Sequence, residues 1–218
     1  MTLIPSHHPD KSTLISYAAG SLPEHQAIAI SCHLHTCDIC RDTVSKAEQL
    51  GSLLLEEIKP TAVSSTVRHH LIRQLDTTLT DSSAKDNPPM TGDIPPPLSR
   101  LVGYQLDTLN WKRLVPGIKQ LLIRKSPQQG QLRLLKIAPG TCMPAHSHSG
   151  SELTLVLKGS YTDETGRYRA GDIADMDSDI HHQPVADTHE ACICLIASDG
   201  PLKFNSWVPR LLQPFFGI

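Results

Sequence analysis

Residues 140–159 read GTCMPAHSHSGSELTLVLKG, a stretch whose spacing is G-x5-H-x-H-x3-E-x6-G. On a β-strand, residues of equal parity face the same side of the sheet, so His146 and His148 share a face. Glu152 keeps that parity if no bulge intervenes. From position 153 onward leucine alternates with other residues, which gives the strand one apolar face and one mixed face. The three ligand-type side chains are therefore predicted to converge inside an antiparallel β-barrel.

The chain downstream supplies a fourth candidate ligand. Gly171-Asp172 open a further predicted strand, which leads to the sequence Asp-Ile-His181-His182-Gln-Pro184. A facing strand there could contribute one histidine, and the spacing does not decide between His181 and His182. Short runs separated by Gly and Pro predict strands, an arrangement typical of an antiparallel sandwich or barrel, at 121–124, 132–137, 152–157, 172–176 and 191–197.

Two features close to the C-terminus bear on function. Cys192 and Cys194 lie at equal parity on one predicted strand. They are either small buried apolar residues or thiols whose oxidation would affect a metal ion bound by the candidate ligands above. The sequence leaves both interpretations open. Residues 201–218 contain four of the nine aromatic residues and are expected to cover the barrel. If exposed, this tail would be a docking surface, which leaves weak self-association open.

The first 85 residues have a helical rather than a strand-like pattern. Tyr17 is the only aromatic residue among them, and so small a helical domain often needs a staple such as a metal. Leu, Ile, Val and Ala recur at helical spacing in four segments: after Asp10, after Leu22, over 37–58 and over 61–79.

A linker separates the helical part from the strand-rich part. Residues 80–97 contain five of the 17 prolines together with Ser, Asp and Gly, a composition typical of an exposed linker. We therefore predict three parts: a helical domain over 1–85, a linker over 86–98 and a strand-rich domain over 99–218.

The helical part contains a second group of candidate ligands. His33, Cys37 and Cys40 form the pattern H-x3-C-x2-C, and helical intervals of three and four residues place side chains on one face. A structural zinc ion takes four N or S ligands, so a fourth must come from elsewhere. The N-terminal histidine pair is the available source, and we favour His8. The alternatives are that Cys37 and Cys40 form a redox-active dithiol, or that the C-x2-C spacing arises by chance.

Composition and charge limit the function classes. The 218 residues are 39% hydrophobic and 19% charged with a formal net charge of -2, so no basic field favours direct contact with nucleic acid. No apolar run approaches the roughly 20 residues that span a bilayer, and the N-terminus lacks signal-peptide order. We expect a cytoplasmic protein without a membrane partner. Its six cysteines should be reduced there, which favours metal or redox chemistry over disulfides.

The stretch HHPDKSTLISYAAGSLPEHQAIAISCHLHTCDICR resembles the zinc-binding anti-sigma domain, whose pattern is an N-terminal His followed by H-x3-C-x2-C. The resemblance implies a short helical bundle that binds an extracytoplasmic-function sigma factor and hides its polymerase-binding surfaces. It also implies a structural zinc at His8, His33, Cys37 and Cys40, with no direct contact to DNA.

The stretch at 140–159 resembles the first cupin motif, and the Gly-Asp to His stretch resembles the second. In the second motif the ligand His is commonly followed two residues later by Pro, which implies His182 rather than His181. The order of anti-sigma domain, linker and cupin is similar to that of the ChrR-like anti-sigma factors. This implies an α+β multidomain protein, with an N-terminal zinc-bound helical bundle followed by a C-terminal antiparallel cupin β-barrel.

The resemblance implies a function for each part. The helical domain would inhibit the sigma factor, and the cupin domain would sense oxidative stress such as singlet oxygen or organic peroxide. Four ligands at His146, His148, Glu152 and His182 suffice for a second Zn2+, although the metal identity is open. Two alternatives are a cupin metal-dependent dioxygenase or isomerase and a small-molecule-binding sensor.

Overall fold

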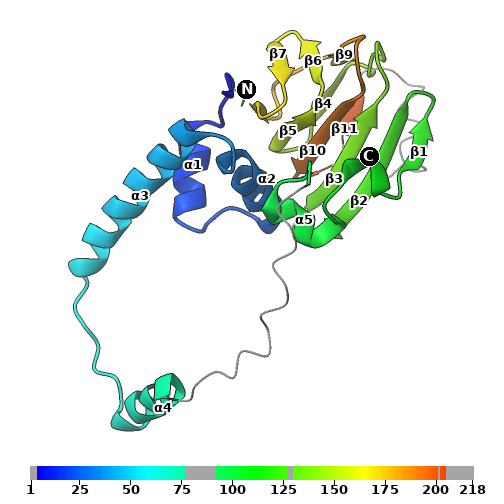
Figure 1. Ribbon diagram of the computed structural model, residues 1–218. Helices are drawn as coiled ribbons and strands as arrows, with labels where there is room; N and C mark the ends of the chain where they lie inside the picture. Colours follow the sequence, from blue (N-terminus) through cyan, green and yellow to red (C-terminus); the bar gives the residue numbers. More distant parts are fainter. Residues whose placement is uncertain (1–3, 77–91, 127–129, 201, 205–218) are drawn as a thin grey trace.

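The computed structural model describes residues 4–76, 92–126, 130–200 and 202–204 (Figure 1). All four helices predicted for the N-terminal part are present, and a short fifth helix and a 3-10 turn precede the strands. Their bounds are α1 (Lys11–Ala18), α2 (Glu24–Leu34), α3 (Asp38–Glu56), α4 (Ser65–Asp76), α5 (Pro96–Val102) and η1 (Leu106–Thr108).

The strands follow from Lys112 onward. The five predicted runs correspond to β2, β3, β5, β8 and β10, although the runs at 172–176 and 191–197 begin one residue before their strands. The strand predicted at His146 and His148 is β4, and the other strands were not predicted. The bounds are β1 (Lys112–Val115), β2 (Ile118–Ser126), β3 (Gly130–Ile137), β4 (His146–His148), β5 (Glu152–Lys158), β6 (Ser160–Asp163), β7 (Gly166–Arg169), β8 (Ile173–Met176), β9 (Val185–Ala186), β10 (Cys192–Ser198) and β11 (Leu202–Phe204).

The described strands form a cupin-like antiparallel sandwich and not the closed barrel that the sequence predicted. A six-stranded sheet has the order β1-β2-β3-β10-β5-β8, and the smaller sheets have the orders β7-β6-β9 and β11-β4. Within the described residues, the smaller sheets are joined to their surroundings by isolated bridges such as His146↔His182. Hydrogen bonds join the strands within each sheet, and the large sheet packs against the β7-β6-β9 sheet through a shared core, as in a sandwich.

The large sheet is buried on both faces. Leu134, Leu153 and Leu195 point to one face, where they share a hydrophobic core with Ile30 of α2 and Leu98 of α5. Figure 1 shows α2 and α5 beside this sheet. Each fully buried leucine stabilises the fold by ~1.5–3 kcal/mol. The helical part and the strand-rich part are therefore held together by one apolar core.

The opposite face of the large sheet lines a second hydrophobic core. Val156, Cys192 and Cys194 point to this side, where they pack with Tyr161 and Tyr168 of the smaller sheet. The alternation along β5 and β10 separates the two sets, as strand geometry requires. The sequence thus predicted the apolar face of β5 correctly, and the structure shows that helices cover it.

Local sequence explains where the first helices end and begin. Gly20 has φ +66°, a left-handed conformation that favours glycine, and its N–H is bonded to the carbonyl of Tyr17 at the end of α1. Pro23 is the N-cap residue of α2. Proline suits a helix start because its fixed φ is compatible and its missing N–H is not needed.

Part of the predicted linker lies outside the described residues, which omit 77–91. At its end, Ile94 and Leu98 are only 4% and 0% exposed. This end of the segment therefore belongs to the core, and the division into three parts stays a prediction. The predicted C-terminal cover, 201–218, is described only over β11, which pairs with β4. Among the described residues, no helix has the length and hydrophobicity needed to cross a membrane.

Candidate metal centres

The structure brings together the four predicted ligands of the N-terminal part. The Nδ1 atom of His8 lies 3.3 Å from Cys37 Sγ and 3.4 Å from Cys40 Sγ. The Nε2 atom of His33 lies 3.3 Å from Cys40 Sγ. All four ligand atoms lie within 4.8 Å of one another, close enough to surround a single ion. Two nitrogen and two sulfur donors are a set that tetrahedral zinc prefers.

Each donor comes from a helix end or from the segment before α1. His33 occupies the last turn of α2, Cys37 is the N-cap residue of α3, and Cys40 follows in its first turn. The Nδ1–H of His33 donates to the Gly171 carbonyl at 2.9 Å, which leaves the Nε2 lone pair facing Cys40. Because Gly171 precedes β8, the strand-rich part directly orients one of these ligands.

Burial makes the imidazole suitable as a metal ligand. It lowers the pKa of His33 to about 4, so the ring is neutral at pH 7. Burial and the neighbouring Cys37 raise the pKa of the Cys40 thiol to about 12. A divalent cation between the sulfur atoms would favour the thiolate forms, because it neutralises their charge. The donor set therefore fits zinc.

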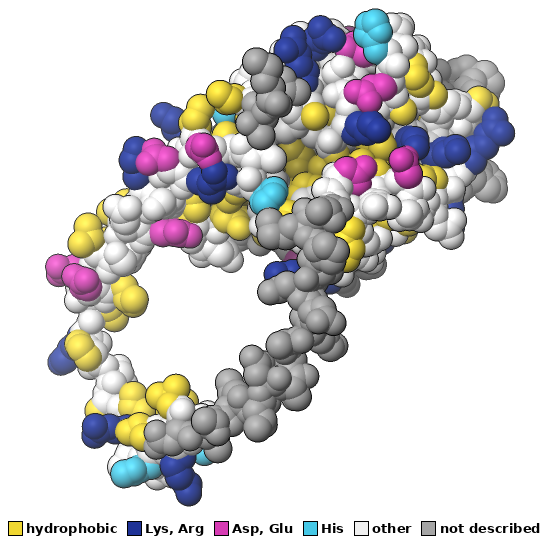
Figure 2. Space-filling model, in the orientation of Figure 1, with side chains coloured by type: hydrophobic (Ala, Val, Ile, Leu, Met, Phe, Trp, Pro, Cys, Tyr) yellow, Lys and Arg dark blue, Asp and Glu magenta, His cyan; other side chains and the backbone are white. Residues whose placement is uncertain are grey.

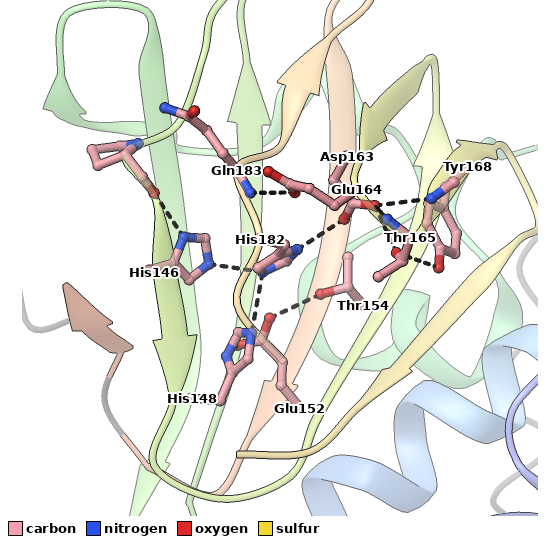
Figure 3. A network of polar contacts seen from close by, with 12 residues as sticks. His146, His148, Glu152, Thr154, Asp163, Glu164, Thr165, Tyr168, His182 and Gln183 are labelled. Carbon is pink, nitrogen blue, oxygen red and sulfur yellow. Dashed lines mark hydrogen bonds and ion pairs between the residues drawn. The ribbon is translucent and has the colours of Figure 1, made fainter. Parts of the chain in front are cut away.

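Three histidines form the second cluster, in the strand-rich part (Figure 3). The Nε2 atom of His182 lies 3.0 Å from Nε2 of His146 and 3.2 Å from Nε2 of His148. All three side chains are buried, with residue exposures of 2–4%. His181 is exposed, so the structure places the second of the two adjacent histidines in the cluster. This agrees with the choice that the cupin resemblance implied.

Hydrogen bonds fix which ring atoms face the centre. His146 Nδ1 donates to the Pro144 carbonyl at 2.8 Å, and His182 Nδ1 donates to Asp163 Oδ2 at 2.8 Å. Both rings therefore direct an Nε2 lone pair toward the same point. Burial lowers the pKa of His146 to about 4, which keeps its ring neutral. Nitrogen lone pairs that converge in this way repel one another unless a cation lies between them. This cluster therefore also fits a metal ion.

Glu152 lies beside the three histidines. One carboxylate oxygen, Oε1, accepts a hydrogen bond from Thr154, and the other, Oε2, lies 3.2 Å from Nδ1 of His148. Burial raises the pKa of this carboxyl, but the neighbouring histidines offset it and the net shift is downward. Within the described part of the chain, Glu152 Oε2 and His148 Nδ1 make no hydrogen bond, although both atoms are buried. The role of Glu152 as a fourth metal ligand stays a prediction.

Comparison with known proteins places the chain in a family. Residues 99–202 match the family model described as the ChrR cupin-like domain. Over 216 residues the chain is 40% identical to the anti-sigma-E factor ChrR of Cereibacter sphaeroides. The alignment covers 97% of this chain and 98% of that protein. The chain belongs to the ChrR family of anti-sigma factors.

A solved structure of a ChrR protein has the same fold. The crystal structure of Rhodobacter sphaeroides SigE in complex with the anti-sigma ChrR matches with a TM-score of 0.77 at 37% identity, covering 88% of this chain and 98% of that chain. Membership of the ChrR family supports a regulatory role for this chain.

The predicted cysteine pair lies in the second core of this ChrR-family chain. The sulfur atoms of Cys192 and Cys194 are 3.5 Å apart, and both residues are buried. The adjacent Cys192 thiol and burial raise the pKa of the Cys194 thiol well above its usual range. Buried thiols of this kind are poor nucleophiles. The environment thus favours the packing interpretation, and the redox role stays a prediction.

The sequence analysis missed two acidic residues next to the histidine cluster. Asp163 contacts the His182 ring, and Glu164 Oε2 accepts a hydrogen bond from the backbone N–H of Gln183 at 2.8 Å. Asp163 is the last residue of β6, and Glu164 follows it in the turn to β7 (Figure 3). No spacing rule marks them, because Asp163 lies 19 positions before His182 and Glu164 lies 19 positions before Gln183. The only signal was a turn-like D-E-T-G sequence.

Proposed function

We propose that this ChrR-family chain binds and inhibits an extracytoplasmic-function sigma factor through its N-terminal helices. Release would follow when the strand-rich domain senses oxidative stress such as singlet oxygen or organic peroxide. The solved relative in complex with SigE supports the choice of partner. A partner of this class acts in transcription, which implies a cytoplasmic location and requires no contact between this chain and DNA.

The observation that carries the proposal is an apolar surface on α3 and α4 that the rest of the described chain does not cover. On α4 the side chains of Val67, Leu71 and Leu75 are 50%, 53% and 85% exposed. On α3 those of Leu50 and Leu54 are about equally exposed, at 59% and 61%. Figure 2 shows hydrophobic side chains along both helices, and Figure 1 shows α4 standing away from the sheets.

The spacing of these residues gives α4 an organised face. Val67, Leu71 and Leu75 recur every four positions and so lie along one side of the helix. Soluble monomers rarely expose a contiguous apolar stripe, because water contact with it is unfavourable. A partner protein that covers the stripe would recover this free energy. We therefore assign α3 and α4 to the sigma-binding surface.

We further propose Zn2+ in both centres. Four N and S donors at the N-terminal site leave no open position for a substrate, which suits a structural role. Zinc has no redox chemistry, so an oxidant would act on the ligands or on neighbouring residues. Metal analysis of the purified chain tests this assignment. Two zinc ions per chain support it, whereas iron with oxygen uptake would favour the dioxygenase alternative.

A matched pair of α4 variants tests the sigma-binding surface. Leu71→Asp places a charge in the apolar stripe, and we expect affinity for the sigma factor to fall at least tenfold. His69→Asp places the same charge on the opposite side of α4, at 100° per residue, and should leave affinity within about twofold. Titration of a labelled sigma factor measures both. Equal affinity of Leu71→Asp and the unmodified chain would exclude α4 from the interface.

A further inference from the structure

The hairpin of β6 and β7 contacts a ligand of the histidine cluster through one carboxylate. Asp163 Oδ2 accepts the Nδ1–H of His182 at 2.8 Å, and the Asp163 side chain is 0% exposed. This bond holds the imidazole in the tautomer whose Nε2 faces His146 and His148. Groups that orient a metal-ligating histidine in this way commonly change metal affinity 10–100-fold when removed.

The other oxygen of the same carboxylate organises the turn. Asp163 Oδ1 accepts hydrogen bonds from the Thr165 N–H at 2.9 Å, the Thr165 hydroxyl at 2.6 Å and the Gly166 N–H at 3.2 Å. Since the Thr165 hydroxyl donates to Asp163, it accepts the O–H of Tyr168, which lies 2.9 Å away. The position of the His182 ring is thereby tied to the position of Tyr168 (Figure 3).

Tyr168 connects this hairpin to the N-terminal segment. Its ring packs against the imidazole of His7, with centroids 4.3 Å apart. A Cβ atom on Gly166 would lie 3.2 Å from His7 Nε2, so the turn itself is close to this ring. The His7 N–H donates to Asp172 at 3.1 Å, and its carbonyl accepts from the Ile173 N–H at 3.3 Å. His7 immediately precedes His8, a member of the other cluster.

We propose that Asp163 is a positioning residue for the histidine cluster. We also propose that the β6–β7 hairpin links this cluster to the N-terminal segment that contains His7 and His8. The path runs from His182 through Asp163, Thr165 and Tyr168 to His7. Loss of the metal would free His182, loosen the turn and reduce the packing of Tyr168 on His7. The inference rests on the proposed metal centres, but it does not depend on sigma binding.

The positioning role is tested by zinc affinity. In Asp163→Ala we expect the affinity of the histidine cluster for zinc, from chelator competition, to fall about 10–100-fold. The NMR signal of the His182 Nδ1 proton should be lost as well. Asp163→Asn, which keeps the side-chain shape, serves if the alanine variant does not fold. Asp187→Asn removes another carboxylate that contacts this hairpin and should leave zinc affinity unchanged. Equal zinc affinity of Asp163→Ala and Asp187→Asn would overturn the assignment.

The link between the centres is tested by hydrogen exchange at the His7 amide. His148→Ala should remove only the second zinc, and metal analysis checks that the first remains. In the otherwise unmodified chain this change should accelerate His7 exchange at least fivefold. In a Tyr168→Phe background, which lacks the bond to Thr165, the acceleration should fall below about twofold. The same acceleration in both backgrounds, or none in either, would overturn the link.

Neither experiment contains a sigma factor. A negative result would leave sigma binding intact, and failure of the sigma titration would leave these results standing. A chain that binds no zinc at the histidine cluster would overturn both this inference and the proposed second centre.

Discussion

At the scale of single residues, each cluster depends on groups that orient its imidazoles. A backbone carbonyl fixes His33 and another fixes His146, while a carboxylate fixes His182. Each bond fixes the orientation of its ring and directs the other ring nitrogen into the cluster. Such preorganisation favours a cation, because no ring has to rotate when the ion binds.

Removal of one thiolate should destroy the N-terminal centre. In Cys40→Ser we expect the zinc content to fall by one ion per chain and sigma binding to be lost. Structural zinc in small modules supplies ~10–16 kcal/mol of folding free energy, most of which this variant would forfeit. Metal analysis and a pull-down measure the two effects, and Cys142→Ser at an exposed cysteine is the control. Full sigma binding by zinc-free Cys40→Ser would contradict the structural role.

The buried imidazoles predict loss of stability in acid. Burial lowers the pKa of His33 and His146 to about 4, whereas in the unfolded chain both take up protons below about pH 6.5. Between these values the unfolded state binds more protons, so the free energy of unfolding decreases as the pH falls. Each ring contributes up to ~3 kcal/mol at pH 7, and this is lost on the way to pH 4.

Urea unfolding at pH 7.5, 5.5 and 4.5 measures this decrease. In His146→Gln the slope should be shallower, because one of the two rings is absent. A free energy of unfolding that is constant over this range would show that neither ring stays neutral in the folded chain.

At the scale of elements, α2 contributes both to the N-terminal metal centre and to the hydrophobic core of the large sheet. His33 at its end serves the N-terminal centre, while Ile30 packs into the core of the large sheet. Its first turn also contacts the residue that follows β10, since His25 and Gln26 both lie within hydrogen-bond distance of Asp199 Oδ1, at 3.1 and 3.0 Å. The helix therefore connects the part that we assign to sigma binding with the part that we assign to sensing.

Shortening a buried side chain of α2 should destabilise helices and sheet together. We expect Ile30→Ala to lower the free energy of unfolding by ~2–5 kcal/mol, because it leaves a cavity in a fully buried position. Ile15→Ala in α1, at a side chain that is 55% exposed, should cost less than about 0.5 kcal/mol. Hydrogen exchange along both parts measures the effect. A change confined to the helices would show that the two parts have separate cores.

At the scale of the whole molecule, two candidate centres share one framework. The turn before β8 shows this directly, because the Gly171 carbonyl contacts His33 and the Asp172 carboxylate accepts the N–H groups of Ser6 and His7. The first contact reaches His33 of the N-terminal cluster, and the second reaches the segment directly before His8. A change in the sheets can therefore reach the helices without passing through the segment that joins α4 to α5.

Variants of the histidine cluster should separate inhibition from sensing. We expect His148→Ala and Glu152→Ala to repress the sigma factor almost fully, because the surface on α3 and α4 is intact. Induction by singlet oxygen or organic hydroperoxide should be strongly reduced in both, because the proposed sensor has lost its metal. A reporter gene measures both properties, with His181→Ala at the exposed neighbour as the control. Normal induction by metal-free variants would exclude the metal from the sensor.

Local patterns in the sequence determined most of the elements and both groups of candidate ligands. The H-x3-C-x2-C spacing and the equal parity of His146 and His148 hold along any helix or strand, so they could be seen without the fold. The family followed from the same motifs. The predicted cupin fold is confirmed, but the described strands form a sandwich and not a closed barrel. Closure depends on hydrogen bonds between strands, which no local pattern specifies.

Only the tertiary structure decided which surfaces meet. The alternation in β5 showed an apolar face, but not that α2 covers it and joins the two parts in one core. No spacing indicated that Asp163 contacts His182 or that Tyr168 packs on His7, because these contacts join strands and segments far apart in the chain. Periodicity depends on the local backbone, whereas the partner of a side chain is fixed by packing of the whole molecule.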